Sequence, residues 1–206
     1  MYRPAAFAID DPARLRRFIR DNPFATVAAA PQGRVVFAYA PVIVDDDGMR
    51  FHLAAANPLA QMSDGARLSF SVLGPHAYVS PDWYESKSRV PTWNYCAVEG
   101  EGVVRRLDRD ALRELLVDLS AAEETRLAPK DPWTIDQVPE DRMETMLTAI
   151  VGFAVRFETL AGKFKLSQNV SAQDAAGAIA GLDARGDAAG AAVAAAMRTA
   201  RAATGP

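Results

Sequence analysis

Hydrophobic and polar residues alternate along several short segments of this chain, with the two-residue period that is typical of half-buried β-strands. Strands are predicted over residues 24–30, 35–44, 49–54, 67–73, 76–80, 93–105 and 151–157. At Gly74-Pro75 we expect one strand to end and the next to begin. Residues 35–44 carry consecutive short apolar side chains, which predicts burial on both faces of that strand. Gly100 and Gly102 indicate a bulge or a close approach of another backbone.

Hydrophobic residues recur at helical spacing in other segments. Helices are predicted over residues 12–22, 108–126, 131–150 with a break at Pro139, 171–184, and from 187 onward. Asp10 or Asp11 can cap the first helix, and Pro12 suits its first turn. A short helix is also expected to begin at Pro58, with Asn57 as its N-cap.

The chain of 206 residues can bury one sizeable core. We predict one main domain over residues 1–170 and a helical C-terminal extension over residues 171–206. The extension begins with Ser171 and Asp174 at the spacing of a capping box. Its few arginines are expected on the solvated faces of helices that pack on the main domain or on a partner chain, and the sequence leaves both arrangements open.

Composition and charge exclude several classes of function. A net charge of −3 and a pI near 5.4 argue against a protein whose main affinity is for the phosphate backbone of nucleic acid. No apolar run approaches the roughly 20 residues of a membrane span, so we expect a cytoplasmic protein without membrane contact. One cysteine and two histidines exclude an internal disulfide and a histidine-rich metal site, and no metal site is predicted.

Two segments combine aromatic and polar groups in a way that core-forming sequences do not. Residues 74–95, GPHAYVSPDWYESKSRVPTWNY, carry rings together with hydroxyl, amide and imidazole groups and have no helical period. This mixture suits a planar heteroaromatic ligand. A second cluster, GKFKLSQN, covers residues 162–169. Asn57 is a further candidate, because the free amides and dipole at a helix start favour a phosphate.

Each candidate side chain also has a purely structural explanation. His52 can be a half-buried strand histidine bonded to a carbonyl, Lys87 a surface lysine, and Asn57 a plain helix cap. The sequence does not decide between these roles and ligand contact.

The same holds for the residues of the two clusters. Trp93 and Tyr95 share one strand face and fit a core, whereas Asn94 points to the other side and needs partners if it is buried. Lys165 and Gln168 can likewise be structural or can contact a ligand.

The order of these motifs resembles that of a known family. GPHAYVSPDWY, VPTWNY and KFKLSQN follow one another with Asn57-Pro58 upstream, and this arrangement is similar to the PaiB family, described as FMN-binding negative transcriptional regulators. The resemblance covers nearly the whole chain. It implies a mainly β fold with flanking helices, a six-stranded antiparallel split β-barrel related to pyridoxamine 5′-phosphate oxidase. It also implies a homodimer that holds FMN at the dimer interface.

The resemblance further implies which residues bind the cofactor. The candidates are His52, Asn57, His76, Lys87, Thr92, Trp93, Asn94, Lys165, Ser167 and Gln168. His52 and Asn57 match the phosphate-side segment of the family, and residues 92–94 and 165–168 match two other motifs. His76 and Lys165 are the groups expected to tune a bound flavin, and no catalytic residue is assigned.

The phosphate-side segment departs from the family pattern. Relatives typically carry arginine and tryptophan where this chain has Ala55 and Ala60. A charge-assisted hydrogen bond to phosphate contributes about 1.5–3 kcal/mol, or roughly ten- to hundredfold in affinity. The resemblance therefore implies FMN binding that is weakened by the loss of this arginine.

These observations lead to more than one hypothesis for the function. The first is a homodimeric FMN-binding regulator of the PaiB kind that senses flavin or redox state, and its link to DNA comes from the resemblance alone. The second is a flavin-dependent oxidoreductase acting on a small molecule, since this barrel also hosts such enzymes. The third is a binding module for another aromatic ligand, or a barrel that binds no ligand.

Overall fold

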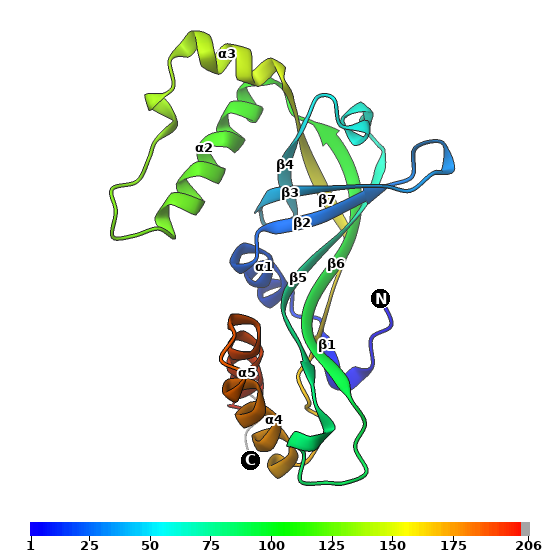
Figure 1. Cartoon of the computed structure of the whole chain (residues 1–206). Coiled ribbons are helices and arrows are strands. Elements are labelled where there is room, and N and C mark those ends of the chain that lie inside the picture. Colours follow the sequence, from blue (N-terminus) through cyan, green and yellow to red (C-terminus); the bar gives the residue numbers. More distant parts are fainter. Residues whose placement is uncertain (203–206) are drawn as a thin grey trace. The chain divides into compact units, whose positions relative to one another are not determined.

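The computed structural model describes residues 1–202, and within this range the chain is built from long strands with helices around them (Figure 1). The strands are β1 (Ala8–Ile9), β2 (Phe24–Ala29), β3 (Val36–Val44), β4 (Gly48–Ala54), β5 (Arg67–Val79), β6 (Thr92–Arg106) and β7 (Ile150–Lys165). The α-helices are α1 (Pro12–Asp21), α2 (Arg109–Thr125), α3 (Glu140–Thr148), α4 (Ala172–Ala184) and α5 (Ala188–Ala202). The 3-10 helices are η1 (Ala5–Phe7), η2 (Pro31–Gly33), η3 (Pro58–Gln61), η4 (Pro81–Trp83) and η5 (Ile135–Gln137). Residues 203–206 of the predicted C-terminal extension lie outside the described residues.

The strands form one sheet in the order β1-β7-β4-β3-β2-β5-β6, and an additional pairing of β7 with β6 closes β2 to β7 into a barrel. Neighbouring strands run antiparallel. Val27 of β2 lies opposite Ala38 of β3, and β4 pairs with β7 along its whole length. The six-stranded antiparallel barrel with flanking helices confirms the predicted fold class.

The described chain forms two compact units. The barrel unit comprises residues 16–72 and 99–160, with β2, β3, β4, α2 and α3. The tail unit comprises residues 1–15, 73–98 and 161 onward, with β1, α4 and α5. Strands β5, β6 and β7 contribute residues to both units. Their motif-bearing ends therefore belong to the tail unit, whereas the segment around Asn57 belongs to the barrel unit.

Apolar side chains fill the interior of the barrel unit. Phe51 of β4 and Phe153 of β7 are completely buried, with ring centroids 5.5 Å apart. A Cβ on Gly100 would lie 2.6 Å from the ring of Phe70, and one on Gly102 would collide with a carbonyl of β7. These contacts confirm the close approach that the two glycines predicted.

Helices α2 and α3 complete the barrel unit, and α2 packs on β3 and β4 (Figure 1). Asp108 caps α2, because its carboxylate accepts a 2.9 Å hydrogen bond from the Ala111 amide. Pro139 is the N-cap of α3, which confirms the predicted break. Before Pro139 only the 3-10 turn η5 is helical, so the helix predicted for that part of residues 131–150 is wrong. Leucines of α2 form a buried cluster with residues of η5 and α3, made of Leu112, Leu115, Leu119, Ile135, Met143 and Leu147.

Burial on both faces of β3, which its apolar composition predicted, is wrong. Ala38 and Ala40 are buried, but Phe37 and Tyr39 are 62% and 66% exposed. A strand of a closed barrel turns only one face to the interior, so the pleat decides which side chains are buried. Phe24 on β2 is also exposed. These three aromatic residues, Phe24, Phe37 and Tyr39, are called the outer β2–β3 face below.

Two long strands replace shorter predicted ones. Gly74-Pro75 does not interrupt β5, because the pairing of β5 with β2 ends at Ser71 and the missing N–H of Pro75 removes no bond to that neighbour. β7 continues from the predicted segment to Lys165, because the two-residue strand β1 pairs with it. A partner strand as short as β1 has no period that the sequence could reveal.

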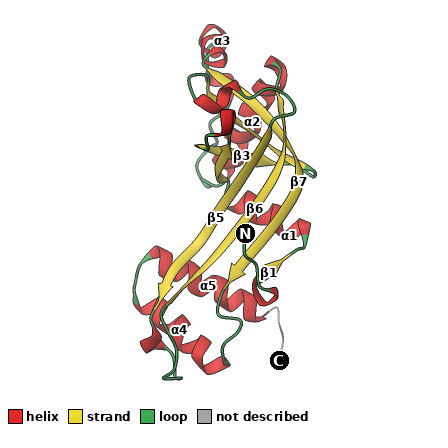
Figure 2. Cartoon of the chain, turned by 90° about the vertical axis from the view of Figure 1, so that its right-hand side faces the viewer, coloured by secondary structure: helices red, strands yellow, loops and turns green. Residues whose placement is uncertain are grey.

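Helices α4 and α5 pack against each other in the tail unit (Figure 2). Helix α4 also lies against η4, where a Cβ on Gly177 would collide with the carbonyl oxygen of Trp83 and one on Gly181 with its indole ring. Within the tail unit, α4 therefore packs on its own chain. Each helix among residues 1–202 is too short or too polar to cross a bilayer.

Candidate ligand site

Three exposed rings lie together on β5 and β6 in the tail unit. The His76 ring stacks on Trp93 with centroids 6.1 Å and planes 25° apart, and Tyr78 meets Trp93 edge-on at 6.5 Å and 72°. Trp93 is 53% exposed. Nδ1 of His76 lies 3.0 Å from the carbonyl oxygen of Gly74, which orients the imidazole. This ring cluster of His76, Tyr78 and Trp93 presents a flat aromatic surface.

Lys165 ends β7 beside the beginning of β6, and its Nζ donates a hydrogen bond to Oγ1 of Thr92. Burial, and then the charge of Lys163, lowers the pKa of the Lys165 ammonium. Lys163 is only 9% exposed. Its Nζ donates a 3.0 Å hydrogen bond to the Tyr2 carbonyl and lies 5.4 and 5.3 Å from the ring centroids of Tyr2 and Tyr95. The fold thus joins two predicted residues and adds Lys163, which the sequence did not single out.

Asn94 and Ser167 meet in the interior of the tail unit. Nδ2 of Asn94 donates a 2.9 Å hydrogen bond to Oγ of Ser167 and lies 3.3 Å from Sδ of Met197 on α5. Both polar residues are buried, and Oδ1 of Asn94 has no hydrogen-bond partner among the described residues. Asn94 faces away from Trp93, as the strand alternation predicted. Because both side chains are buried, we interpret them as positioning residues, and their contact with a cofactor stays a prediction.

Gln168 fixes the turn that follows β7. Its Oε1 accepts a 2.7 Å hydrogen bond from the Leu166 amide, and its Nε2 donates a 2.6 Å bond to the Phe164 carbonyl. Between these anchors Ser167 has φ of 60°, in the left-handed region that residues other than glycine rarely adopt. Such a conformation persists where surrounding contacts determine it. The carboxamide of Gln168 therefore holds the backbone of this motif.

Lys87 lies in an exposed loop between η4 and β6. Asp174 of α4 anchors the loop on both sides of Lys87, because its carboxylate accepts hydrogen bonds from the Ser86 amide at 2.9 Å and from Nε of Arg89 at 3.0 Å. The bond from the Ser86 amide is the main reason why the pKa of Asp174 is lowered. Ser171 caps α4 through the Asp174 amide at 3.1 Å. The predicted capping box is thus half formed, since the loop takes the carboxylate.

His52 belongs to the barrel unit, on β4 opposite Gly152 of β7. Its side chain is half-buried, and its Nδ1 is buried without a hydrogen-bond partner among the described residues. Burial lowers the pKa of the imidazole, so the neutral form is favoured. Contact between His52 and a cofactor stays a prediction.

Asn57 caps η3, as predicted. Its Oδ1 accepts a 2.9 Å hydrogen bond from the Leu59 amide, and its carbonyl accepts a 2.8 Å bond from the Ala60 amide. Pro58 has no N–H, and η3 is a single four-residue 3-10 turn. The amides that were expected to bind a phosphate are therefore already bonded, and so short a turn has little dipole. A phosphate contact at Asn57 stays a prediction.

An arginine does lie beside η3, and one nitrogen of its guanidinium bonds to the backbone there. The guanidinium of Arg106 donates hydrogen bonds to the carbonyls of Ala60 at 2.9 Å and Met62 at 3.2 Å. It also lies 5.8 Å from the ring centroid of Phe153. Arg106 thus holds the end of η3 in place.

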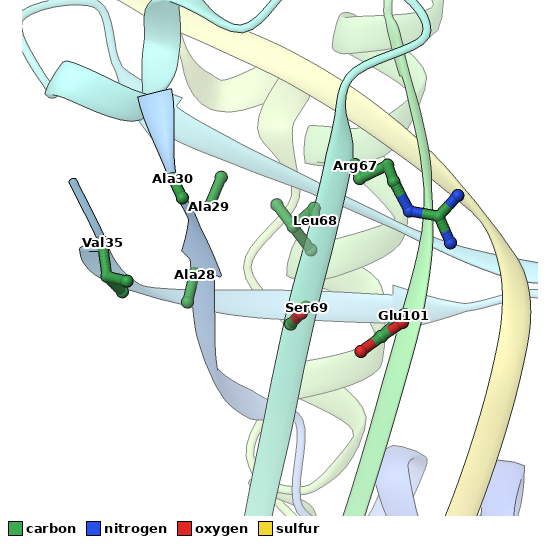
Figure 3. A pocket seen from close by; sticks show the side chains of 8 residues that line it. All are labelled: Ala28, Ala29, Ala30, Val35, Arg67, Leu68, Ser69 and Glu101. Carbon is green, nitrogen blue, oxygen red and sulfur yellow. The ribbon is translucent and has the colours of Figure 1, made fainter. Parts of the chain in front are cut away.

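Two pockets of the barrel unit lie beside β5 and η3, and none of the predicted site residues lines either of them. The first, of about 280 Å³, is lined by Ala28, Ala29, Ala30, Val35, Arg67, Leu68, Ser69 and Glu101 (Figure 3). In Figure 3 the Arg67 side chain extends across β6, where it pairs with Glu158. The second, of about 430 Å³, adjoins η3 through Pro58 and Gln61. Many of the residues that line these pockets are small and apolar, and they follow no periodic pattern from which the pockets could have been predicted.

The closed six-stranded barrel places this protein in the split-barrel class, and solved structures support this assignment. The "FAD and Heme binding protein" of Mycobacterium smegmatis superimposes with a TM-score of 0.57 at 20% identity, over 77% of this chain and 73% of that one. A flavocytochrome of Azotobacter vinelandii gives 0.55 at 15% identity, over 77% and 69%. At such identities the likeness shows the fold alone.

Sequence comparisons then identify the family. Residues 1–159 match the family described as "Putative FMN-binding domain". The chain is 32% identical over 180 residues to "Protease synthase and sporulation protein PAI 2" of Bacillus subtilis (strain 168), covering 84% of this chain and 85% of that protein. An uncharacterized protein of Aspergillus fumigatus is 30% identical, with 90% and 92% covered. The chain belongs to this FMN-binding-domain family, and the predicted PaiB resemblance is confirmed.

Proposed function

We propose that this protein is a homodimer that binds FMN and acts as a negative transcriptional regulator of the PaiB kind, responding to flavin or to its redox state. The single observation that carries the proposal is the exposed ring cluster, which continues along β6 into Thr92 and its partner Lys165. Family membership supports FMN as the ligand. The repressor role is supported by the PaiB resemblance.

The residues of the tail unit fit a flavin. The ring cluster supplies an aromatic face on which a fused heteroaromatic ring can stack, since offset and edge-on ring pairs are favourable. Thr92, which precedes Trp93 in the chain, and its partner Lys165 supply hydroxyl and ammonium groups for the rest of the ligand. When bound, the flavin supplies the redox chemistry, and these side chains orient it and set its electrostatic surroundings.

A second copy of the chain is the proposed occupant of the outer β2–β3 face. Phe24, Phe37 and Tyr39 are 64%, 62% and 66% exposed on neighbouring strands. Contiguous exposed apolar surface of this kind marks interaction sites. We expect light scattering of the purified protein to give the mass of two chains.

The proposed site of action is the cytoplasm, and regulation can be direct or indirect. The net charge of −3 provides little general attraction for DNA. A promoter fragment that is retarded in a salt-sensitive manner would support direct operator binding. Repression without such binding would place the protein upstream of another regulator.

The oxidoreductase hypothesis is the second candidate, and the position of Lys165 favours it. Its ammonium is partly buried and has a lowered pKa, which is typical of lysines that transfer protons in enzymes. Turnover of a reduced nicotinamide or a small-molecule panel by the FMN-loaded protein would favour the enzyme over the regulator.

Titration with FMN, followed by flavin fluorescence and absorbance, tests the proposal most directly. Trp93→Ala should weaken FMN and riboflavin alike, by about threefold to tenfold, because ring pairs contribute about 0.5–1.5 kcal/mol. Trp133→Ala is the matched control, since Trp133 is a partly exposed tryptophan of the barrel unit. A wild-type protein that binds neither flavin at high micromolar concentration would refute the proposal.

A further inference from the structure

Two lysines in the tail unit lack a negative partner. Lys163 and Lys165 lie two residues apart on β7, and Lys163 is 9% exposed. Among residues 1–202, neither ammonium forms an ion pair with a carboxylate; their hydrogen bonds go to the Tyr2 carbonyl and the Thr92 hydroxyl. Three carboxylates of the tail unit pair with arginines, namely Asp10 with Arg3, Asp174 with Arg89 and Asp187 with Arg185.

Burial of uncompensated positive charge is unfavourable in the free protein. The rings of Tyr2 and Tyr95 offset part of this cost by cation–π attraction to Lys163. An ammonium has three N–H donors, and the bond to Tyr2 uses one of those on Lys163. Within the described chain, the two ammonium groups therefore keep uncompensated positive charge and N–H donors without a partner, and an anionic ligand would satisfy both.

We propose that Lys163 and Lys165 form an anion site for a phosphate monoester, with Lys165 and Thr92 in contact with the phosphate and Lys163 adding attraction from behind. Two ammonium groups match the two negative charges of a phosphate monoester. The inference rests on the proposed function to this extent: in FMN, the bound group is the 5′-phosphate. The lysine pair then provides the positive charge that the segment around Ala55 lacks.

The binding test compares FMN with riboflavin, which lacks only the phosphate. Dissociation constants are measured by flavin fluorescence for wild type, Lys165→Met and Lys163→Met. Lys165→Met should weaken FMN by about ten- to hundredfold, the range expected for a charge-assisted hydrogen bond, and should change riboflavin by less than about twofold. Lys163→Met should show the same selectivity with a smaller loss. Lys130→Met is the matched control, because Lys130 is exposed and pairs with Glu124.

Two binding results would overturn the assignment. Equal weakening of FMN and riboflavin by Lys165→Met would mean that the lysine contacts the ring system or supports the fold. Unchanged FMN affinity in both lysine variants would mean that the phosphate binds elsewhere.

Thermal unfolding of the ligand-free variants separates a binding role from a structural one. If the charge is kept for a ligand, Lys163→Met should unfold at the same temperature as wild type or higher, since the substitution removes an unpaired buried charge. A melting temperature well below wild type, together with equal loss of both flavins, would assign Lys163 to the fold instead.

Inorganic phosphate tests the anion site separately from flavin binding. At constant ionic strength, phosphate should raise the melting temperature of wild type more than chloride does, and Lys165→Met should abolish this difference. If wild type binds no flavin but shows this effect, the proposed function fails and the anion site stands. If phosphate and chloride act alike on wild type, the anion site is refuted, whatever the flavin result.

Discussion

The segment around Asn57 and the end of β7 were both predicted to hold the cofactor. They differ in how many of their polar groups remain free to bind a ligand. Around Asn57, the cap and the following amides bond to one another within three residues. At the end of β7, Lys165 and Ser167 bond to residues 73 positions away, and positive charge remains without a counter-charge. The comparison teaches that binding capacity depends on which hydrogen bonds the fold leaves unmade.

The range of the contacts explains this difference. A cap such as Asn57 is satisfied by its own turn, whatever the rest of the chain does. The lysines, by contrast, are held by a strand whose partners β1 and β6 come from distant parts of the sequence. The tail-unit region is therefore more dependent on packing, and changes that disturb this packing should have the largest effects.

Gly177→Leu should give the largest effect. A Cβ at this position already collides with the carbonyl oxygen of Trp83, so a leucine must displace η4 or α4. Overpacking of this kind costs about 1–3 kcal/mol in free energy of unfolding. The shift of η4 should also weaken FMN, because η4 precedes the loop that leads to Thr92. Urea unfolding and FMN titration measure both effects.

The control for this variant is Ala176→Leu, at an exposed position of the same helix. It should leave stability and FMN affinity close to wild type. If Gly177→Leu lowers stability but leaves FMN affinity unchanged, the tail helices do not support the candidate site, and the contrast between the two regions weakens.

A smaller effect is expected from pH, through His52. Its pKa in the folded protein lies below the ordinary value of 6.5, because burial disfavours the charged form. On acidification the unfolded chain takes up the proton first, so stability falls as the pH drops through about 6.5 and levels off below the folded pKa. His52→Leu should flatten this part of the profile. Urea unfolding at about six pH values between pH 8 and pH 5 measures how the free energy of unfolding changes with pH. Equal slopes in wild type and His52→Leu would contradict the expected burial of a neutral imidazole.

The smallest effect is expected from Ala55→Arg. If the lysine pair holds the phosphate, restoring the family arginine should change FMN affinity by no more than about twofold, well below the tenfold that a charge-assisted bond gives. The measurement is the same FMN and riboflavin titration. A gain of tenfold or more for FMN alone would move the phosphate to the segment around Asn57 and would contradict our assignment to Lys163 and Lys165.

Much of the fold could be predicted, because strand alternation, caps and turn residues are local properties. The helix after Pro12, the cap at Asn57 and the close approach at Gly102 all follow from residue type and spacing. The exposed side of β3 and the continuity of β5 through Pro75 could not be predicted. Both depend on which neighbour each strand has, and pairing partners lie outside any local window.

The candidate site could be predicted in part for the same reason. The residue types of the ring cluster and of the Lys165 motif were evident from the sequence, and so was the placement of Trp93 and Asn94 on opposite sides of their strand, but not that Trp93 is the exposed one. The use of Asp174 to anchor the loop around Lys87, and the position of Lys163 between Tyr2 and Tyr95, were not. These contacts join segments more than 60 residues apart.

The sequence by itself determined the family, most of the strands and helices, and the chemical groups available for a ligand. Only the tertiary structure decided which of those groups are already satisfied. Oδ1 of Asn57 and the carboxamide of Gln168 form hydrogen bonds with neighbouring backbone groups. The ammonium groups of Lys163 and Lys165, by contrast, have no negative partner within residues 1–202. The physical reason is that a charge is compensated or not by the groups around it. Those groups come from strands that the fold brings together from distant parts of the sequence.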